Sequence, residues 1–327
     1  MEVSQSHFHC IDRKQEFMKD FHIIKNRLCF IISALIFFIL FTSCEKNFDI
    51  KVSSNTPKLV VEAYINNEMR TYNYVILSRS VDYLSPNFES TPVTDAKITI
   101  TEGERAGDGY NWDTNKKVQL QSLNIPGIPN ELANIYFDPR LLTDSSSALI
   151  GKPGKSYLLE ISEGGNQYSA ITTLLQPVQI DSLTTGYGFT DEDDSSKYKL
   201  RITNNYQDPD TLGNTQLYFS RSYTERNSFG WGSFSGNRNN SFGSDELTNG
   251  QYMRITHSWG FQVGDTVEYH MASVTRDVYD FWISFNNARN NGGPFATPVT
   301  LATNIVGPNV TGGFLGMSLS SRVVVIK

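Results

Sequence analysis

Side chains that commonly carry out catalysis are scarce in this 327-residue chain, which has five histidines and three cysteines. His257 and His270 lie in stretches with the composition of β-strands, where either could act as a general base or a metal ligand. A histidine that is hydrogen-bonded for structural reasons is the more common case. We therefore expect both to be structural.

Motifs of known catalytic or nucleotide-binding function are also missing from the sequence. It has no His-Glu-x-x-His motif, no P-loop and no Gly-x-Gly-x-x-Gly after a strand. A nucleophile elbow needs serine midway between its glycines, whereas Phe234 holds that place between Gly232 and Gly236. We predict a protein that is not an enzyme and needs no cofactor. A hydrolase that uses separated Asp and Glu carboxylates is the remote alternative.

Two acidic loops offer oxygen ligands of the kind that calcium prefers. Residues 191–194 read Asp-Glu-Asp-Asp, and Asp208 and Asp210 flank a proline. Neither segment matches the twelve-residue calcium loop with its glycine and terminal glutamate. We therefore predict solvated acidic turns and no metal site.

Residues 227–243 (NSFGWGSFSGNRNNSFG) are almost entirely glycine, serine, asparagine and aromatic residues. Phe229, Trp231, Phe234 and Phe242 could form an exposed loop that binds a glycan or a partner protein. The alternation of the first two fits a hairpin whose aromatic side chains cap the core equally well. Because loops of this composition are common without function, a structural or disordered segment is favoured.

An apolar stretch at residues 28–41 (LCFIISALIFFILF) carries no charge and follows Lys19, Lys25 and Arg27. A helix of this length spans about 21 Å, less than the ~30 Å hydrocarbon core of a bilayer. A basic region, a short apolar region and small residues before a cleavage point are typical of a secretory signal. An uncleaved anchor is the alternative.

Cys44 directly follows this stretch, so residues 1–43 resemble a bacterial lipoprotein signal peptide whose cleavage leaves a lipidated Cys44. Met18 begins an ordinary signal and is an alternative start. Cleavage removes Cys10 and Cys29 with the leader. The mature chain then has no disulfide, thiol nucleophile or cysteine-rich zinc site available.

The charge and length of the chain limit the classes of function further. With 28 basic and 34 acidic residues, the formal net charge of −6 argues against binding to nucleic acid, which needs a basic patch or stripe. The length suits one large or two ordinary domains. Residues 44–57 are polar, end at a proline and are predicted to be a tether.

Strand patterns dominate the first half of the body, residues 58–176. We predict strands at 58–66, 72–78 and 93–101, and a hairpin of 157–162 and 168–174 around two glycines. Short strands at this spacing predict a β-sandwich of immunoglobulin-like size. Gln176 and Pro177 are predicted to form the hinge to a second domain, because proline cannot donate to a sheet.

The second half, residues 177–327, is predicted to be a β-rich domain with one amphipathic helix. Its expected strands lie at 198–203, 216–223, 252–257, 265–271 and 322–327, with turns throughout 204–214. A helix over about 275–290 is predicted from one apolar face, with Thr275 as its N-cap. That face consists of Val274, Val278, Phe281, Trp282 and Phe285.

The order of these segments resembles that of the outer-membrane lipoproteins of Bacteroidota in the family called domain of unknown function 4249. The resemblance implies a largely β protein that is lipid-anchored in the cell envelope and often encoded beside TonB-dependent outer-membrane receptors. It implies no catalytic residue. The matching segments are Cys44, residues 59–65, 75–78, 92–100, 154–161 and 177–183, the helix, and residues 293–299, 304–306 and 312–316.

We therefore expect a non-catalytic cell-envelope lipoprotein, held in the outer membrane by lipid on Cys44. Both the periplasmic and the surface face of that membrane are compatible with this prediction. As an accessory or docking partner, it would assist a TonB-dependent receptor in nutrient uptake. The alternative is a free-standing lipoprotein that binds a glycan or peptide with the aromatic loop at 227–243.

Overall fold

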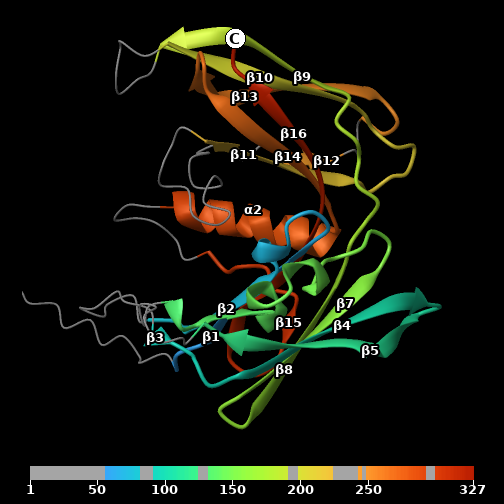
Figure 1. The fold of residues 1–327 in the computed structure, drawn as a ribbon, viewed down its shortest axis with the longest axis vertical. Helices are drawn as coiled ribbons and strands as arrows, with labels where there is room; N and C mark the ends of the chain where they lie inside the picture. The colour runs from blue at the N-terminus through green and yellow to red at the C-terminus, as the bar shows by residue number, and fades with distance from the viewer. Residues whose placement is uncertain are drawn as a thin grey trace, which may run out of the picture. The chain divides into compact units, whose positions relative to one another are not determined.

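The computed structural model describes residues 56–81, 91–123, 132–190, 198–223, 242–244, 248–291 and 299–327. Residues 54–327 form one compact unit (Figure 1). The predicted signal peptide, Cys44, the acidic loop at 191–194 and most of the aromatic segment lie outside the described residues. Within the described residues, no helix is long and apolar enough to cross a membrane.

The fold is mainly β, which confirms the predicted class, and it has one α-helix among the described residues. The strands are β1 (Leu59–Asn66), β2 (Tyr74–Arg79), β3 (Thr91–Pro92), β4 (Lys97–Ala106), β5 (Gly109–Ser122), β6 (Ile135–Phe137), β7 (Ser156–Glu163), β8 (Asn166–Thr173), β9 (Ser182–Thr190), β10 (Tyr198–Gln207), β11 (Thr215–Ser222), β12 (Phe242–Ser244), β13 (Tyr252–Gln262), β14 (Thr266–Val274), β15 (Ile305–Val306) and β16 (Val310–Val325). The helices are η1 (Arg70–Tyr72), η3 (Pro139–Leu142), η4 (Ser145–Ser147) and α2 (Arg276–Asn290).

Thirteen of the described strands form one curled sheet, in the order β12-β11-β14-β16-β1-β2-β6-β5-β4-β7-β8-β15, with β3 beside β2. β16 is long and pairs with β14 on one edge and, in parallel, with β1 on the other. β15 pairs with β8. These pairings join strands from both predicted halves in one sheet, and a domain boundary at Pro177 stays a prediction.

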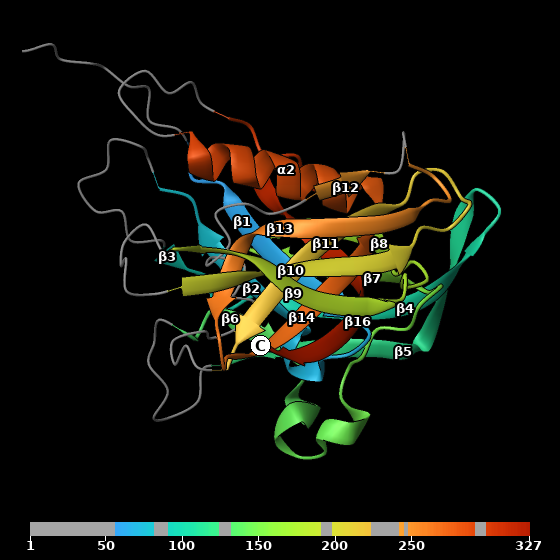
Figure 2. The same ribbon diagram turned by 90° about the horizontal axis from the view of Figure 1, so that it is seen from above.

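A second sheet, in the order β13-β10-β9, lies over β11, β14 and β16 (Figure 2). The side chains between these two layers form a buried cluster that includes Ile202, Tyr206, Tyr218, Tyr269 and Met271. Alternation along most of β13 explains the layer, since from Tyr252 to Ser258 one face of the strand is half-buried or buried and the other is exposed.

The core inside the curled sheet follows the predicted alternation closely. Ile98 and Ile100 of β4 are fully buried, and they pack with Leu59 and Val61 of β1. The predicted hairpin is confirmed as β7 and β8, and its turn uses Gly164 and Gly165 at φ 56° and 80°. Glycine is suited to that turn because it adopts positive φ without steric cost.

The predicted turns throughout 204–214 are wrong for their first four residues, which extend β10 to Gln207. Asn204 is completely buried, and its Nδ2 donates to the Met271 sulfur at 3.3 Å. The hydroxyls of Tyr206 and Tyr218 are hydrogen-bonded at 2.7 Å. Asn204 and Tyr206, which lie in the predicted turn, thus make hydrogen bonds to the facing sheet instead.

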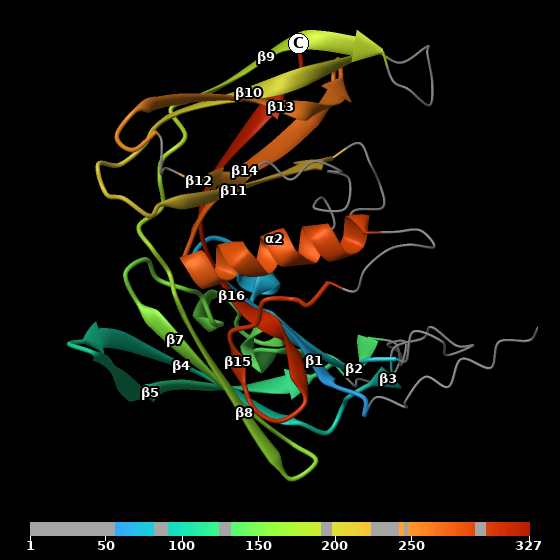
Figure 3. The same cartoon turned by 180° about the vertical axis from the view of Figure 1, so that it is seen from behind.

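Helix α2 packs on the sheet face formed by β11, β14 and β16 (Figure 3). The helix is confirmed, and Val278, Phe281 and Trp282 of its apolar face are buried, whereas Phe285 is exposed and Val274 ends β14 instead of belonging to the helix. Thr275 occupies the N-cap position, but its hydroxyl makes no capping hydrogen bond.

Replacing Trp282 with alanine is expected to lower the free energy of unfolding by about 3–5 kcal/mol, as for other buried aromatic residues. Trp282 is 5% exposed and its ring lies 6.1 Å from that of Phe219. The matched change of Phe285, which is 38% exposed, is expected to cost less than about 2 kcal/mol. Urea denaturation of both variants measures the difference, and equal losses would contradict this packing.

Candidate functional site

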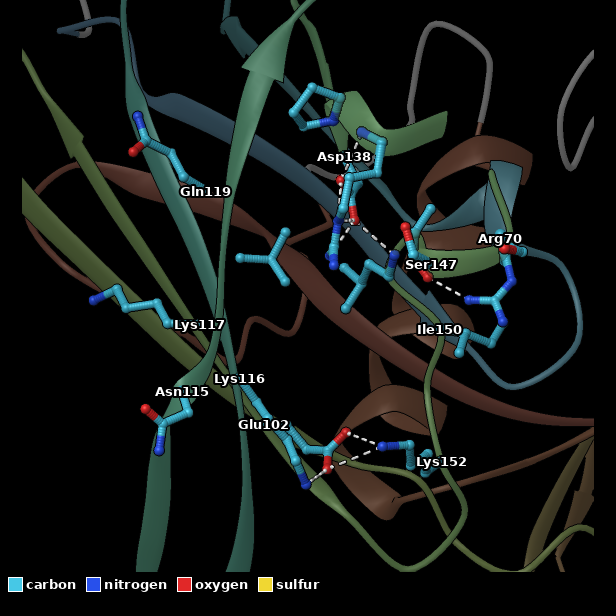
Figure 4. A pocket seen from close by; sticks show the side chains of 16 residues that line it. Arg70, Glu102, Asn115, Lys116, Lys117, Gln119, Asp138, Ser147, Ile150 and Lys152 are labelled. Atoms are coloured by element: carbon cyan, nitrogen blue, oxygen red, sulfur yellow. Dashed lines mark hydrogen bonds and ion pairs between the residues drawn. The ribbon is translucent and has the colours of Figure 1, made fainter. Parts of the chain in front are cut away.

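A groove of about 550 Å³ opens between β5 and the segment that joins β6 to β7 (Figure 4). Arg70 of η1, Glu102 of β4 and Lys116 of β5 line it, with Arg140 and Lys152 from the joining segment. Apolar side chains also line the groove, among them Val118, Leu149 and Ile150. The size lies within the usual range for small-molecule sites, but the many charges are unusual for one.

A bulge in β5 places Lys116 in this groove. Residues 113–116 lie opposite the single residue Glu102 in the pairing of β4 with β5. The carboxylate of Asp113 accepts a hydrogen bond from the Asn115 backbone N–H at 3.0 Å, which folds the extra residues into a turn. Bulges redirect side chains out of the regular pleat, and this one brings the Lys116 ammonium to the Glu102 carboxylate.

Glu102 anchors one end of the groove. Its carboxylate lies 2.7 Å from the ammonium of Lys116 and 3.3 Å from that of Lys152. Burial alone would raise the pKa of Glu102, but hydrogen bonds from the two ammonium groups outweigh it and hold the pKa below its usual value. The carboxylate is therefore ionised at neutral pH.

Asp138 anchors the other end. Arg140 donates to its carboxylate through Nε at 3.0 Å and through a terminal nitrogen at 2.6 Å. The backbone N–H groups of Arg140 and Leu149 donate to it as well. Burial of Asp138 opposes ionisation, yet these four donors lower its pKa below the usual value.

The two carboxylates are more deeply buried than the cations with which they pair. The side chains of Glu102 and Asp138 are 9% and 2% exposed, whereas those of Lys116, Arg140 and Lys152 are 47%, 43% and 52% exposed. A molecule that enters the groove therefore meets positive groups first. Lys117 and Gln119 extend from the other side of β5, away from Glu102 (Figure 4).

The described lining residues suit binding better than proton transfer. Both carboxylates are ion-paired with lowered pKa values, so neither is poised to act as a general acid near neutral pH. The hydroxyl of Ser146 donates to the Asp144 carboxylate at 2.6 Å, and that of Ser147 to the Asp144 backbone carbonyl at 3.0 Å. What the groove offers a ligand is ammonium and guanidinium N–H groups.

Both histidines of the body lie away from this groove. His257 is fully buried, its Nε2 lies 2.7 Å from the Tyr269 hydroxyl, and its ring stacks on Trp259. Burial lowers the pKa of His257 to about 3. Burial likewise lowers the pKa of His270 to about 4; its Nδ1 is hydrogen-bonded to Ser321. The Ser321 hydroxyl also donates a hydrogen bond to the Glu68 carboxylate.

The aromatic residues singled out in the sequence can be placed only in part. Phe229, Trp231 and Phe234 lie outside the described residues. Phe242 begins β12, whose backbone pairs with β11 at Leu217. The prediction of an aromatic binding loop therefore stays a prediction.

The acidic turn at Asp208 is not solvated as predicted. Asp208 is 4% exposed, and its carboxylate accepts a hydrogen bond from the Gly250 backbone N–H at 3.1 Å. Asp210 is exposed. Among the described residues, no three side chains of the metal-binding types gather in one place.

The groove itself was not among the sites predicted from the sequence. Its residues come from four separate segments, and the only local signal is the polar run of residues 113–117 before the alternation of Val118 and Leu120. Such a run is usually a solvated surface.

Comparison with known proteins gives a family. The model of the family described as "Domain of unknown function (DUF4249)" matches residues 45–322. No curated protein matches the chain. The match covers most of the sequence and nearly all of the described strands, and the chain therefore belongs to the DUF4249 family.

Proposed function

We propose that this protein is a non-catalytic lipoprotein of the outer membrane that acts beside a TonB-dependent receptor in nutrient uptake. The observation that carries the proposal is the position of Cys44 at the end of a signal-like leader. The family match begins at residue 45, directly behind it. Cys44 therefore lies where the first residue of a mature, lipid-anchored chain is expected.

The groove supports a binding role in this proposal. Its described lining presents three partly exposed cations, Lys116, Lys152 and Arg140, to a ligand. An accessory protein needs such a surface to hold a ligand or to contact its receptor. The association with a receptor rests on the family resemblance.

The proposal is tested by purifying the natively lipidated protein in mild detergent through a tag placed after Lys327, with mass spectrometry of the proteins that accompany it. We expect one TonB-dependent receptor in a stoichiometric amount. A matched Cys44→Ala variant is expected to be lost from the outer-membrane fraction and to lose the receptor. Recovery of the lipoprotein alone, from membranes rich in the receptor, would exclude the accessory role.

A further inference from the structure

We propose that the groove between β5 and the β6–β7 segment is a binding site for a small multivalent oxyanion, a ligand with at least two carboxylate or phosphate groups. The inference rests on the proposed binding role and names the ligand class for it. Three features carry it: the exposed cations, the N–H groups they leave unused, and the buried carboxylates that hold them in place.

The cations occupy two separate ends of the groove. Lys116 and Lys152 share the Glu102 carboxylate at one end, and Arg140 is paired with Asp138 at the other. A ligand with a single charge would fill one end only. A ligand with two acidic groups reaches both, which is why the geometry favours a multivalent anion.

Each cation keeps donors for a ligand after it has bonded to the protein. A lysine ammonium has three N–H groups, and a guanidinium has five. Arg140 uses its Nε and one terminal nitrogen on Asp138, so its other terminal nitrogen is not bonded to Asp138, and the side chain is 43% exposed. Arginine in this arrangement can donate a second pair of hydrogen bonds to an oxyanion.

The buried carboxylates fix these cations without neutralising their exposed side. Glu102 lies beneath Lys116 and Lys152, so a ligand that approaches from solvent contacts the ammonium groups before the carboxylate. Glu102 is thus an internal counter-ion, and the ligand competes with it for the ammonium groups of Lys116 and Lys152.

The test measures binding of two probes, tripolyphosphate and trigalacturonate, to the full-length protein in detergent by titration calorimetry at low salt. Binding of either probe supports the site, and the stronger probe identifies phosphate or carboxylate as the source of the charge. Lys116→Gln and Lys152→Gln are each expected to weaken binding about tenfold, since each removes a charge-assisted contact. Binding is expected to weaken as salt is added.

Lys117→Gln is the matched control. Lys117 is the next residue on β5, is 43% exposed and also borders the groove, but its side chain extends away from Glu102 and its ammonium pairs with Glu160. Its loss is expected to leave the affinity within about twofold, because its ammonium is directed away from the cations that the ligand contacts. Equal weakening by Lys116→Gln and Lys117→Gln would indicate general charge attraction and overturn the site.

Glu102→Gln separates a binding site from a structural ion pair. Removing the internal counter-ion frees the Lys152 ammonium from Glu102 and leaves that of Lys116 with Asp113 alone, at 3.7 Å, and we expect the probe to bind about threefold tighter or better. An ion pair that only supports the fold would give a lower melting temperature and no gain in affinity. Failure of both probes with the wild-type protein overturns the inference, while a receptor recovered in the purification would still support the proposed function.

Discussion

The exchange of Gly312 for alanine is expected to break the pairing of β16 with β1 and to lower the free energy of unfolding by more than about 4 kcal/mol. Gly312 has φ of +106° and lies opposite Val61 in the parallel pairing. An alanine Cβ there would lie 1.9 Å from the Val61 carbonyl oxygen, which is backbone and cannot rotate away. Backbone strain and the clash act together at the strand that joins both parts of the sheet.

Gly186→Ala is the matched control for this prediction. Gly186 also lies in a strand, β9, but nothing lies within 4 Å of the place where its Cβ would be. We expect its free energy of unfolding to change by less than about 1 kcal/mol. Circular dichroism during guanidinium denaturation compares the two variants. A wild-type midpoint for Gly312→Ala would show that β1 and β16 are not paired in this register.

Stability is expected to fall steeply as the pH is lowered below about 6.5 because of the buried histidines. Their pKa values in the folded protein, about 3 for His257 and about 4 for His270, lie below the ordinary value of 6.5 that the unfolded chain shows. The unfolded state therefore takes up protons first. Each histidine contributes little pH dependence above pH 6.5 and costs up to about 1.4 kcal/mol of stability per pH unit between pH 6.5 and its folded pKa, about 3 for His257 and about 4 for His270.

His257→Gln tests this assignment, because glutamine can hydrogen-bond the Tyr269 hydroxyl but does not titrate. Between pH 6.5 and 4, we expect the free energy of unfolding to fall less steeply with decreasing pH in the variant than in the wild type. The difference in slope corresponds to about one proton fewer taken up on unfolding. Acidic groups such as Glu102 and Asp138 lose their stabilising ionisation below their lowered pKa values in both proteins, so they cancel in the difference. Parallel curves would mean that His257 is protonated in the folded state.

The elements that alternation predicts are those with one face in a core. β4, β7 and β8 were found in this way because their apolar residues, such as Ile98 and Ile100, point into the curled sheet. The helix was found for the same reason, since Val278, Phe281 and Trp282 lie on one buried face. In each case burial and sequence pattern have a common cause.

Other elements left no such pattern. β5 is exposed along most of its length, so its polar residues gave no period of two. The first half of β16 is rich in glycine because the β1 backbone approaches it closely at Gly312 and the Phe281 side chain of α2 approaches it at Gly313. The groove depends on contacts such as that of Glu102 with Lys152, 50 residues apart, and sequence spacing alone does not reveal such a pair.

The position of β16 has a consequence for the order of events during folding. Its residue Leu319 donates a backbone hydrogen bond to the side chain of Asn67, across 252 positions of the chain. Until β16 has joined the sheet, β1 and β14 each have an edge that nothing else in the described sheet can fill. Incompletely folded chains thus carry two strands open to aggregation, and closure over so long a loop is slow. A chaperone that shields strand edges would therefore raise the yield of folded protein more than one that only accelerates local structure.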